Sequence, residues 1–350
     1  MEPAPAATSI QTQPTRSARP MAALQMLGLA TVAAIGLFAI CVPFVLSNYM
    51  VRVATTVCMY LALAQSWNLI GGYAGLLSLA HPAFFGSGAI GATILLLNGA
   101  SLTLAAIGGI LLALVLAALI GIPTLRLQGH YFVVATMLIT EAARNLVLNL
   151  DAFKFNGGIA ANIINYVGLV DLDIQAYNAL FFYVMAAIAA VTMLVAIVLE
   201  RSRWGLALRA VRDDEKAASA LGVSAAWLKI SVFLISAGLA AAVGVAWAFW
   251  LGTVEANEAY NLAFTFEVIV MVFLGGRGTL WGPVLGVFII LMLNEFIGIE
   301  LAEINLIVLG LIVMAIVLFQ PDGLARVLQE GPAALAPRRL AANFRRYRIK

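Results

Sequence analysis

The longest stretch without a charged side chain constrains this chain more than any other feature: none of the 73 residues between Arg52 and Arg126 is Asp, Glu, Lys or Arg. Further charge-free stretches separate Arg19 from Arg52, Asp173 from Glu200 and Lys229 from Glu255. A transmembrane helix needs roughly 20 apolar residues, so the longest stretch has room for about three. Only 11% of the 350 residues are charged, against about a quarter in soluble domains. These features predict one polytopic, all-α integral membrane domain.

Apolar segments between glycine and proline turns predict about ten transmembrane helices within a transmembrane domain of residues 21–320. The predicted spans are 21–46, 50–70, 76–97, 102–121, 130–150, 177–199, 228–251, 263–276, 282–298 and 303–319. The segment 263–276 is short, which suggests a half-helix or a tilted segment. Residues 1–20 are rich in Pro, Ala, Thr and Ser and are predicted to be a disordered tail. Residues 321–350 form a basic C-terminal tail whose arginine pairs suit anionic lipid.

The distribution of basic residues predicts the orientation, because Lys and Arg concentrate in cytoplasmic loops. With the N-terminus inside, only Arg52 and Lys154 lie outside and Arg144 lies within a span, which leaves seventeen of the twenty basic residues in the cytoplasm. The opposite orientation would place those seventeen outside. The sequence therefore predicts an N-in, C-in topology with an even number of spans.

The charged loop of residues 200–228 carries a distinctive local pattern. Three consecutive acidic residues suit the first turn of a short helix, where carboxylates complement the helix dipole; they are Asp213, Asp214 and Glu215. Small residues follow and give a compact surface: Ala217, Ala218 and Ala220, with Leu221. Gly222 can end the helix in the left-handed conformation. The alternative is a plain solvated loop, which does not explain an alanine-rich helix with a glycine stop.

Three segments of the sequence resemble a known family. Glu215-Lys216-Ala217-Ala218, followed by Gly222, resembles the "EAA…G" coupling motif of ABC importer permeases. Residues 203–215, which include Arg209 and Arg212, are similar to the branched-chain amino-acid (LivM-type) permeases, as are residues 66–81 and 275–286. The resemblance covers roughly residues 50–320 in consistent order. One departure is Ser219-Ala220, where the family more often has a second Glu-Ala pair.

The resemblance implies a mechanism and a set of partners. The short helix would dock on a cytoplasmic ATPase subunit, with the ATPase-coupling residues being Arg209, Arg212, Asp213, Asp214, Glu215, Ala217, Ala218 and Gly222. The partners implied are a homologous second permease in a heterodimer, two ATPase subunits and a periplasmic solute-binding protein, all at a bacterial inner membrane.

Hydrolysis itself is expected on the partners. A phosphate-binding loop needs Gly-Lys followed by Ser or Thr, and no lysine here is followed by either residue. We therefore expect no enzymatic activity and no cofactor on this chain, with ATP and Mg bound by the ATPase subunits. The small net charge of +3 and scattered basic clusters also argue against nucleic-acid binding.

Polar residues inside the predicted spans are candidates for function or for helix packing. Glu141 and Arg144 are three residues apart, so they can pair on one helical face, either as a structural ion pair inside the bundle or along the solute path. Glu267 and Glu295 are further acids in or near spans. Interhelical hydrogen bonds are expected from Gln65, Asn68 and Asn294. His81 is expected to be structural, since no catalytic triad or metal cluster accompanies it.

Two further patterns concern packing. Small residues recur as stripes that permit close helix contact in lipid, at Gly86, Gly88, Gly91 and Ala92 and again at Gly108, Gly109, Ala113 and Ala117. The turn at residues 71–76 resembles the turn at 275–280, and a proline and a glycine follow each. This similarity is either a parallel duplication or two independent glycine turns.

The leading functional hypothesis is a permease subunit for branched-chain or related amino acids. Within the same importer class, the alternative is urea or a short amide, because the motifs concern coupling and fold and not the solute. From a different class, the alternative is a self-sufficient secondary transporter or channel. It would use ion-coupling groups within the membrane and need no ATPase, and Glu141 with Arg144 is the feature that favours it.

Overall fold

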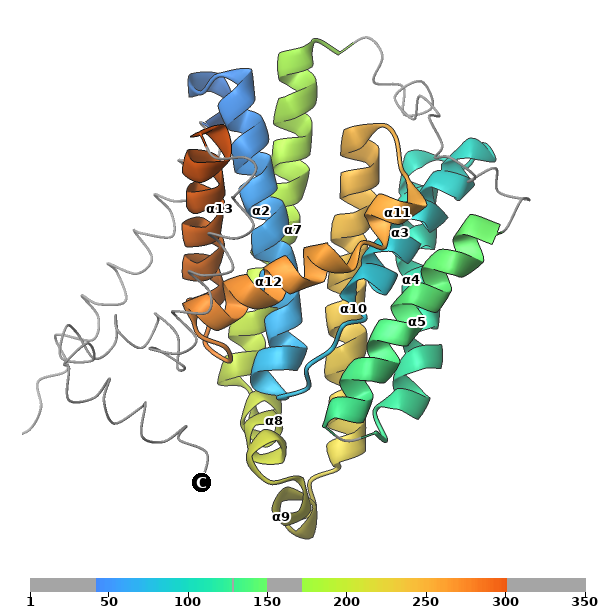
Figure 1. The fold of residues 1–350 in the computed structure, drawn as a ribbon, viewed down its shortest axis with the longest axis vertical. Helices are drawn as coiled ribbons and strands as arrows, with labels where there is room; N and C mark the ends of the chain where they lie inside the picture. The colour runs from blue at the N-terminus through green and yellow to red at the C-terminus, as the bar shows by residue number, and fades with distance from the viewer. Residues whose placement is uncertain (1–41, 128, 150–171, 301–350) are drawn as a thin grey trace, which may run out of the picture. The chain divides into compact units, whose positions relative to one another are not determined.

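The computed structural model describes residues 42–127, 129–149 and 172–300, which form helices joined by short turns (Figure 1). The chain divides into two units, residues 1–45 and 46–350, and the description below concerns the second. Its helices are α2 (Asn48–Asn68), the π-helix η1 (Leu69–Tyr73), α3 (His81–Leu97), α4 (Leu102–Thr124), α5 (His130–Asn149), α7 (Ile174–Arg201), α8 (Arg203–Asp213), α9 (Glu215–Ala220), α10 (Ala225–Leu251), α11 (Ala256–Ala259), α12 (Leu262–Gly275) and α13 (Gly282–Glu300). The all-α prediction is confirmed for these residues.

Among the described residues, six helical stretches are long and apolar enough to cross a membrane, so this is a multi-pass membrane protein. They are Asn48–Tyr73, Leu102–Thr124, His130–Asn149, Ile174–Arg201, Ala225–Leu251 and Ala256–Gly275, and α3 and α13 contribute shorter apolar helices. Residues 21–41 of the first predicted span, the predicted span 303–319 and the tails 1–20 and 321–350 lie outside the described residues. The count of about ten spans and the N-in, C-in topology stay predictions.

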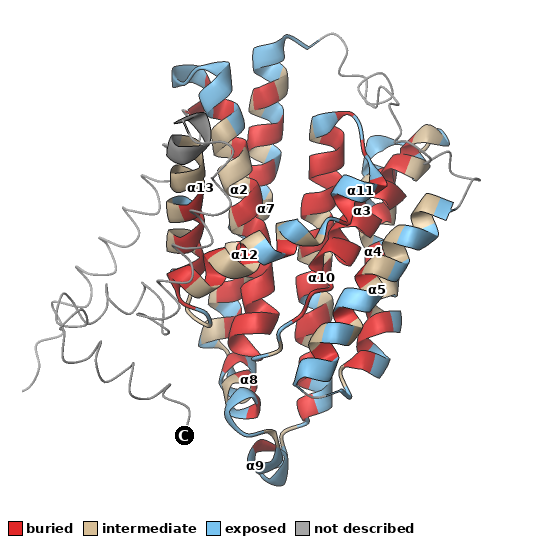
Figure 2. Cartoon of the chain, viewed as in Figure 1, coloured by how far each residue is buried: buried red, intermediate tan, exposed pale blue. Residues whose placement is uncertain are grey.

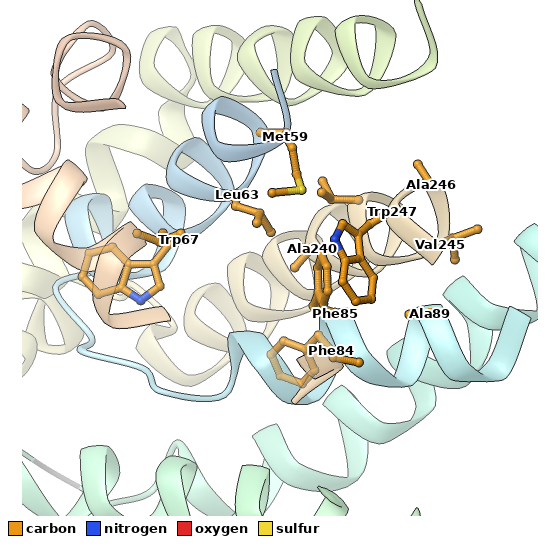
Figure 3. Packing of buried hydrophobic residues seen from close by; sticks show 14 of the residues in the cluster. Met59, Leu63, Trp67, Phe84, Phe85, Ala89, Ala240, Val245, Ala246 and Trp247 are labelled. Atoms are coloured by element: carbon orange, nitrogen blue, oxygen red, sulfur yellow. The ribbon is translucent and has the colours of Figure 1, made fainter. Parts of the chain in front are cut away.

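Helix α10 is the centre of the bundle and packs against α2, α3 and α4 (Figure 1). Buried residues follow its length, whereas α4 and α5 carry broad exposed surfaces (Figure 2). Aromatic rings fill the space between α3 and α10: Phe85 lies 5.1 Å from Trp247 and Phe84 lies 5.2 Å from Phe233, ring centre to ring centre (Figure 3). Aromatic side chains thus form much of the interface between α3 and α10.

The glycine stripes on α3 and α4 bring backbones together, as their spacing predicts. A Cβ atom on Gly88 would lie 2.6 Å from the carbonyl oxygen of Ala241 in α10. One on Gly109 would lie 2.5 Å from the carbonyl oxygen of Gly88 itself. Both distances are far shorter than van der Waals contact, so only glycine allows α4, α3 and α10 to pack this closely.

The prediction of a helix over residues 76–97 is wrong at its start, because α3 begins only at His81. Residues 74–80 instead form a non-helical connection after η1, of which Ala74 and residues 78–80 are buried. Inside a membrane, such backbone is tolerated only where protein groups satisfy it. The Leu79 amide donates to Thr136 Oγ1 (3.1 Å), and Thr140 Oγ1 donates to the Leu79 carbonyl (2.9 Å). Both threonines belong to α5, which therefore stabilises the break.

Helix α12 corresponds to the short predicted span at 263–276. It runs across α2 rather than alongside it, and α13 then turns back beside α2 (Figure 1). Of the two alternatives predicted for this segment, a half-helix or a tilted segment, the crossing of α2 favours the tilted segment. Because α12 crosses the bundle, its C-terminal glycine turn reaches the end of α2 where η1 begins.

Candidate functional site

The predicted short helix of the charged loop is present as α9, at the end of the bundle where α7 and α10 are joined (Figure 1). Asp214 caps it: one carboxylate oxygen accepts hydrogen bonds from the backbone amides of Lys216 (2.9 Å) and Ala217 (3.0 Å). Gly222 follows with φ of +85°, the left-handed conformation expected of a glycine stop. Asp213 does not lie in the first turn, since it is the last residue of α8.

The small residues of α9 face two directions. Ala218 is buried and packs with Leu208 and Val211 of α8 and with Leu228 of α10. Ala217 and Ala220 are exposed, and Leu221 at the tip keeps 85% of its surface exposed. Ala218 therefore holds α9 to this chain, while the exposed tip is the part that a partner can contact.

An ion pair ties α9 to the central helix. The ammonium of Lys229, near the start of α10, lies 2.7 Å from the carboxylate of Glu215. The Lys229 side chain is only 9% exposed, whereas that of Glu215 is 40% exposed. A buried ammonium needs this partner, because an unpaired buried charge is strongly unfavourable. Sequence alone does not single out Lys229, since its partner is fourteen residues away across a turn.

Arg212, near the end of α8, joins the charged loop to two distant turns. Its Nη1 atom donates to the carbonyl oxygen of Gly72 in η1 at 2.7 Å. Gly75 and Gly278 leave room for the side chain: a Cβ on Gly75 would lie 2.6 Å from Arg212 Cγ, and one on Gly278 would lie 2.7 Å from Nη1. Both glycines have positive φ. The two similar glycine turns thus meet at Arg212, which sequence spacing cannot show.

Asn68 fixes the two glycine turns directly to each other. Its Oδ1 accepts from the Gly278 amide (2.8 Å), and its Nδ2 donates to the Thr279 carbonyl (3.0 Å). Gln65 Nε2 adds a bond to the carbonyl of Leu280 at 3.3 Å. The predicted interhelical bond is present for Gln65, whose Nε2 also donates to Met193 Sδ of α7 at 3.6 Å, whereas Asn68 bonds to the turn between α12 and α13 and not to another helix. Arg212 therefore contacts a hydrogen-bonded network that joins α2 and η1 to the turn between α12 and α13.

Arg209 makes a second contact between α8 and the spans. Its Nη2 atom lies 2.9 Å from Oε1 of Glu200, at the end of α7. Its guanidinium also lies over the Tyr73 ring, 5.5 Å from the ring centre, at the end of η1. Arg209 and Arg212 therefore contact neighbouring residues of η1 from successive turns of α8.

Glu141 and Arg144 form the predicted ion pair, and Arg144 Nη1 also lies 3.4 Å from Oδ1 of Asn257 in α11. The pair does not lie inside the bundle of this chain: the Glu141 and Arg144 side chains stay 40% and 32% exposed. It lies in the half of α5 remote from α9, because α11 follows the far end of α10.

The other acids within the spans bind neighbouring helices. Tyr60 of α2 donates to Glu267 Oε2 at 2.7 Å, and Asn294 of α13 donates to Oε1 at 3.1 Å. Glu295 accepts from Tyr49. Glu267 of α12 thus binds both α2 and α13, and the interhelical hydrogen bond predicted for Asn294 is confirmed.

His81 begins α3 directly after the break and is buried. Its Nε2 lies 3.2 Å from Ser236 Oγ and 3.4 Å from Ser66 Oγ, so it bridges α2, α3 and α10. It also lines a mostly apolar pocket with residues of α2, α3, α11 and α12. Within the described part of the chain, no group of three His, Cys, Asp or Glu side chains is arranged to hold a metal.

Comparison with known proteins identifies the family. A family model described as "Branched-chain amino acid transport system / permease component" matches residues 49–317. The chain belongs to this family. It is 30% identical over 309 residues to the high-affinity branched-chain amino acid transport system permease protein LivM of Escherichia coli K12, covering 81% of this chain and 71% of that protein. The probable LivM of Methanocaldococcus jannaschii is 26% identical over 64% of this chain and 70% of its own length.

A more distant relative transports a different solute. The fructose import permease protein FrcC of Rhizobium meliloti is 29% identical over 37% of this chain and 36% of its own length. No solved structure matches the chain significantly. The family match includes all of α8 and α9 and most of the described bundle.

Proposed function

We propose that this chain is a permease subunit of an ATP-binding-cassette importer that translocates branched-chain or related amino acids across a bacterial inner membrane. Solute is delivered by a periplasmic binding protein. A homologous second permease completes the membrane part as a heterodimer, and two cytoplasmic ATPase subunits bind ATP and Mg and hydrolyse the nucleotide. This chain binds no cofactor and catalyses no reaction of its own.

The observation that carries the proposal is the linkage through Arg212 from the loop to both glycine turns. In the proposed mechanism, the tip of α9 with Leu221 docks in a groove on an ATPase subunit. Closure of the ATPases displaces α9 and α8 together, because Ala218 packs on α8 and Glu215 holds Lys229 of α10. Arg212 then moves η1 and the turn before α13. Two rigid helix groups can thereby change their relative position.

Co-purification with the ATPase subunits tests this proposal. Leu221→Asp places a charge on an apolar tip that is 85% exposed, so the variant should fold normally but lose the ATPases. Leu221→Met keeps an apolar side chain of similar volume and should retain them. If Leu221→Asp and the wild-type chain recover equal amounts of ATPase, or if the wild-type chain recovers none, docking through α9 is wrong.

A further inference from the structure

The outward surface of α5 differs from the outward surfaces of the other long spans. Of the most apolar 18 residues of α5, only 17% are buried in this chain, against 33% for the corresponding residues of α4 and of α7 and 72% for those of α10. Its mean hydropathy is nevertheless 1.4, far below 2.7 for α4 and 2.6 for α7. The least covered span is thus also one of the most polar, which is the reverse of what lipid exposure requires.

The charged and amide side chains of α5 form one stripe along its second half. Asn145 and Asn149 are exposed and the Glu141–Arg144 pair is partly exposed, and the stripe is bordered by the exposed apolar residues Leu138 and Leu146. The opposite stripe, with Phe132, Thr136 and Thr140, is buried against the rest of the chain. Apart from Thr103 near its start, the exposed residues of α4 are apolar and include Leu104, Ile107, Leu111, Leu112, Val115, Leu119 and Ile122. Helix α4 therefore suits lipid or an apolar partner surface, whereas the second half of α5 carries a polar stripe beside an apolar one that includes Leu146.

The ion pair has unused hydrogen-bonding capacity. Glu141 Oε1 accepts from Arg144 and, at 3.3 Å, from Asn145 Nδ2, and the bond from Arg144 Nη1 to Asn257 is long at 3.4 Å. Arg144 Nε is buried and has no acceptor among the described residues. A guanidinium suits a carboxylate through paired N–H donors, and a carboxylate suits an ammonium. A neighbouring cation and anion together match a molecule that carries both charges on adjacent carbons.

We infer that the polar stripe of α5 is a wall of the solute pathway, in which Arg144 binds the α-carboxylate and Glu141 the α-ammonium of a zwitterionic amino acid. This inference rests on the proposed function and specifies which residues contact the solute. The stripe faces the second permease across the pathway. The apolar side chain of the solute contacts Leu138 and the facing surface of the second permease.

Thiol accessibility tests the pathway wall. In a complex whose chain carries Cys41→Ser and Cys58→Ala, Asn145→Cys should react with a charged, membrane-impermeant thiol reagent, and leucine with loaded binding protein should slow the reaction. Ile107→Cys is the matched control. It lies at a similar distance from the corresponding end of α4, is 51% exposed in this chain, and should stay unreactive. Failure of Asn145→Cys to react, or reaction without protection by leucine, overturns the inference.

Charge exchange distinguishes solute contact from a structural ion pair. Arg144→Gln should lower leucine uptake at limiting concentration by about tenfold or more, the effect of losing a hydrogen bond to a charged group. The exchange Glu141→Arg/Arg144→Glu restores an ion pair but reverses its direction. It should recover the thermal stability and assembly of the complex without recovering uptake. Recovered uptake would show a structural pair and refute the inference, whereas a wild-type complex without ATP-dependent uptake would refute the proposed function instead.

Discussion

Replacement of Arg212 should uncouple ATP hydrolysis from transport. Arg212→Ala removes the 2.7 Å bond to the Gly72 carbonyl and empties the space beside Gly75 and Gly278. A hydrogen bond to a charged group contributes about 1.5–3 kcal/mol, and partial exposure of Arg212 places this one near the lower end, about 1–2 kcal/mol. If that bond carries motion between the loop and the spans, its loss changes the coupling equilibrium by a factor of about 5–30.

The assay is the number of ATP molecules hydrolysed per leucine transported, in proteoliposomes that contain the complete complex and loaded binding protein. Arg212→Ala should raise this ratio by the same factor of about 5–30. Arg212→Lys keeps the charge without the planar guanidinium and should give an intermediate ratio. Arg203→Ala is the control, since Arg203 is an exposed arginine at the other end of α8. A wild-type ratio in Arg212→Ala would refute transmission through this residue.

Three further predictions concern stability and are measured by thermal unfolding of the purified complex. Glu215→Gln should destabilise the complex by about 1–3 kcal/mol because it leaves the ammonium of Lys229 buried and unpaired. The double variant Glu215→Gln/Lys229→Met should recover most of that loss. No recovery would contradict a stabilising role for the ion pair. Thr140→Val should lower the stability by about 1–3 kcal/mol because it removes the hydroxyl that donates to the Leu79 carbonyl before α3. Thr93→Val is the control and should be nearly neutral, because the Thr93 hydroxyl bonds only within its own helix. Equal effects of the two variants would refute the role assigned to Thr140. Gly275→Ala places a Cβ 1.7 Å from a carbonyl oxygen of α13, so it should destabilise by about 1–3 kcal/mol or prevent assembly, and normal unfolding would contradict this close contact.

Local chemistry explains what the sequence could predict. Charge-free stretches locate the long helices, because a charge in lipid is costly and its absence over about 20 residues is informative. The boundaries of α9 follow from Asp214 and Gly222, whose capping roles depend only on neighbouring backbone. The bond between Glu141 and Arg144 follows from helical spacing alone. In each case the determining contacts lie within a few residues of one another.

Long-range contacts explain what the sequence could not predict. Residues 76–80 are apolar and compatible with a helix, and their non-helical conformation depends on threonines of α5 some sixty residues away. The partners of Arg212 lie on two turns that are distant in sequence from each other and from α8. The exposed side of the Glu141–Arg144 pair depends on which helices leave α5 uncovered. Helical periodicity contains none of this information.

ATP-dependent uptake by the purified complex tests the central claim most directly. The chain would be reconstituted in liposomes with the second permease and the ATPase subunits, with ATP inside or absent, and radiolabelled leucine would be added outside with the binding protein. The account predicts accumulation that requires both ATP and the binding protein, and loss of accumulation with Leu221→Asp. Accumulation driven by an ion gradient by this chain alone, without ATPase subunits, would contradict it and identify a secondary transporter.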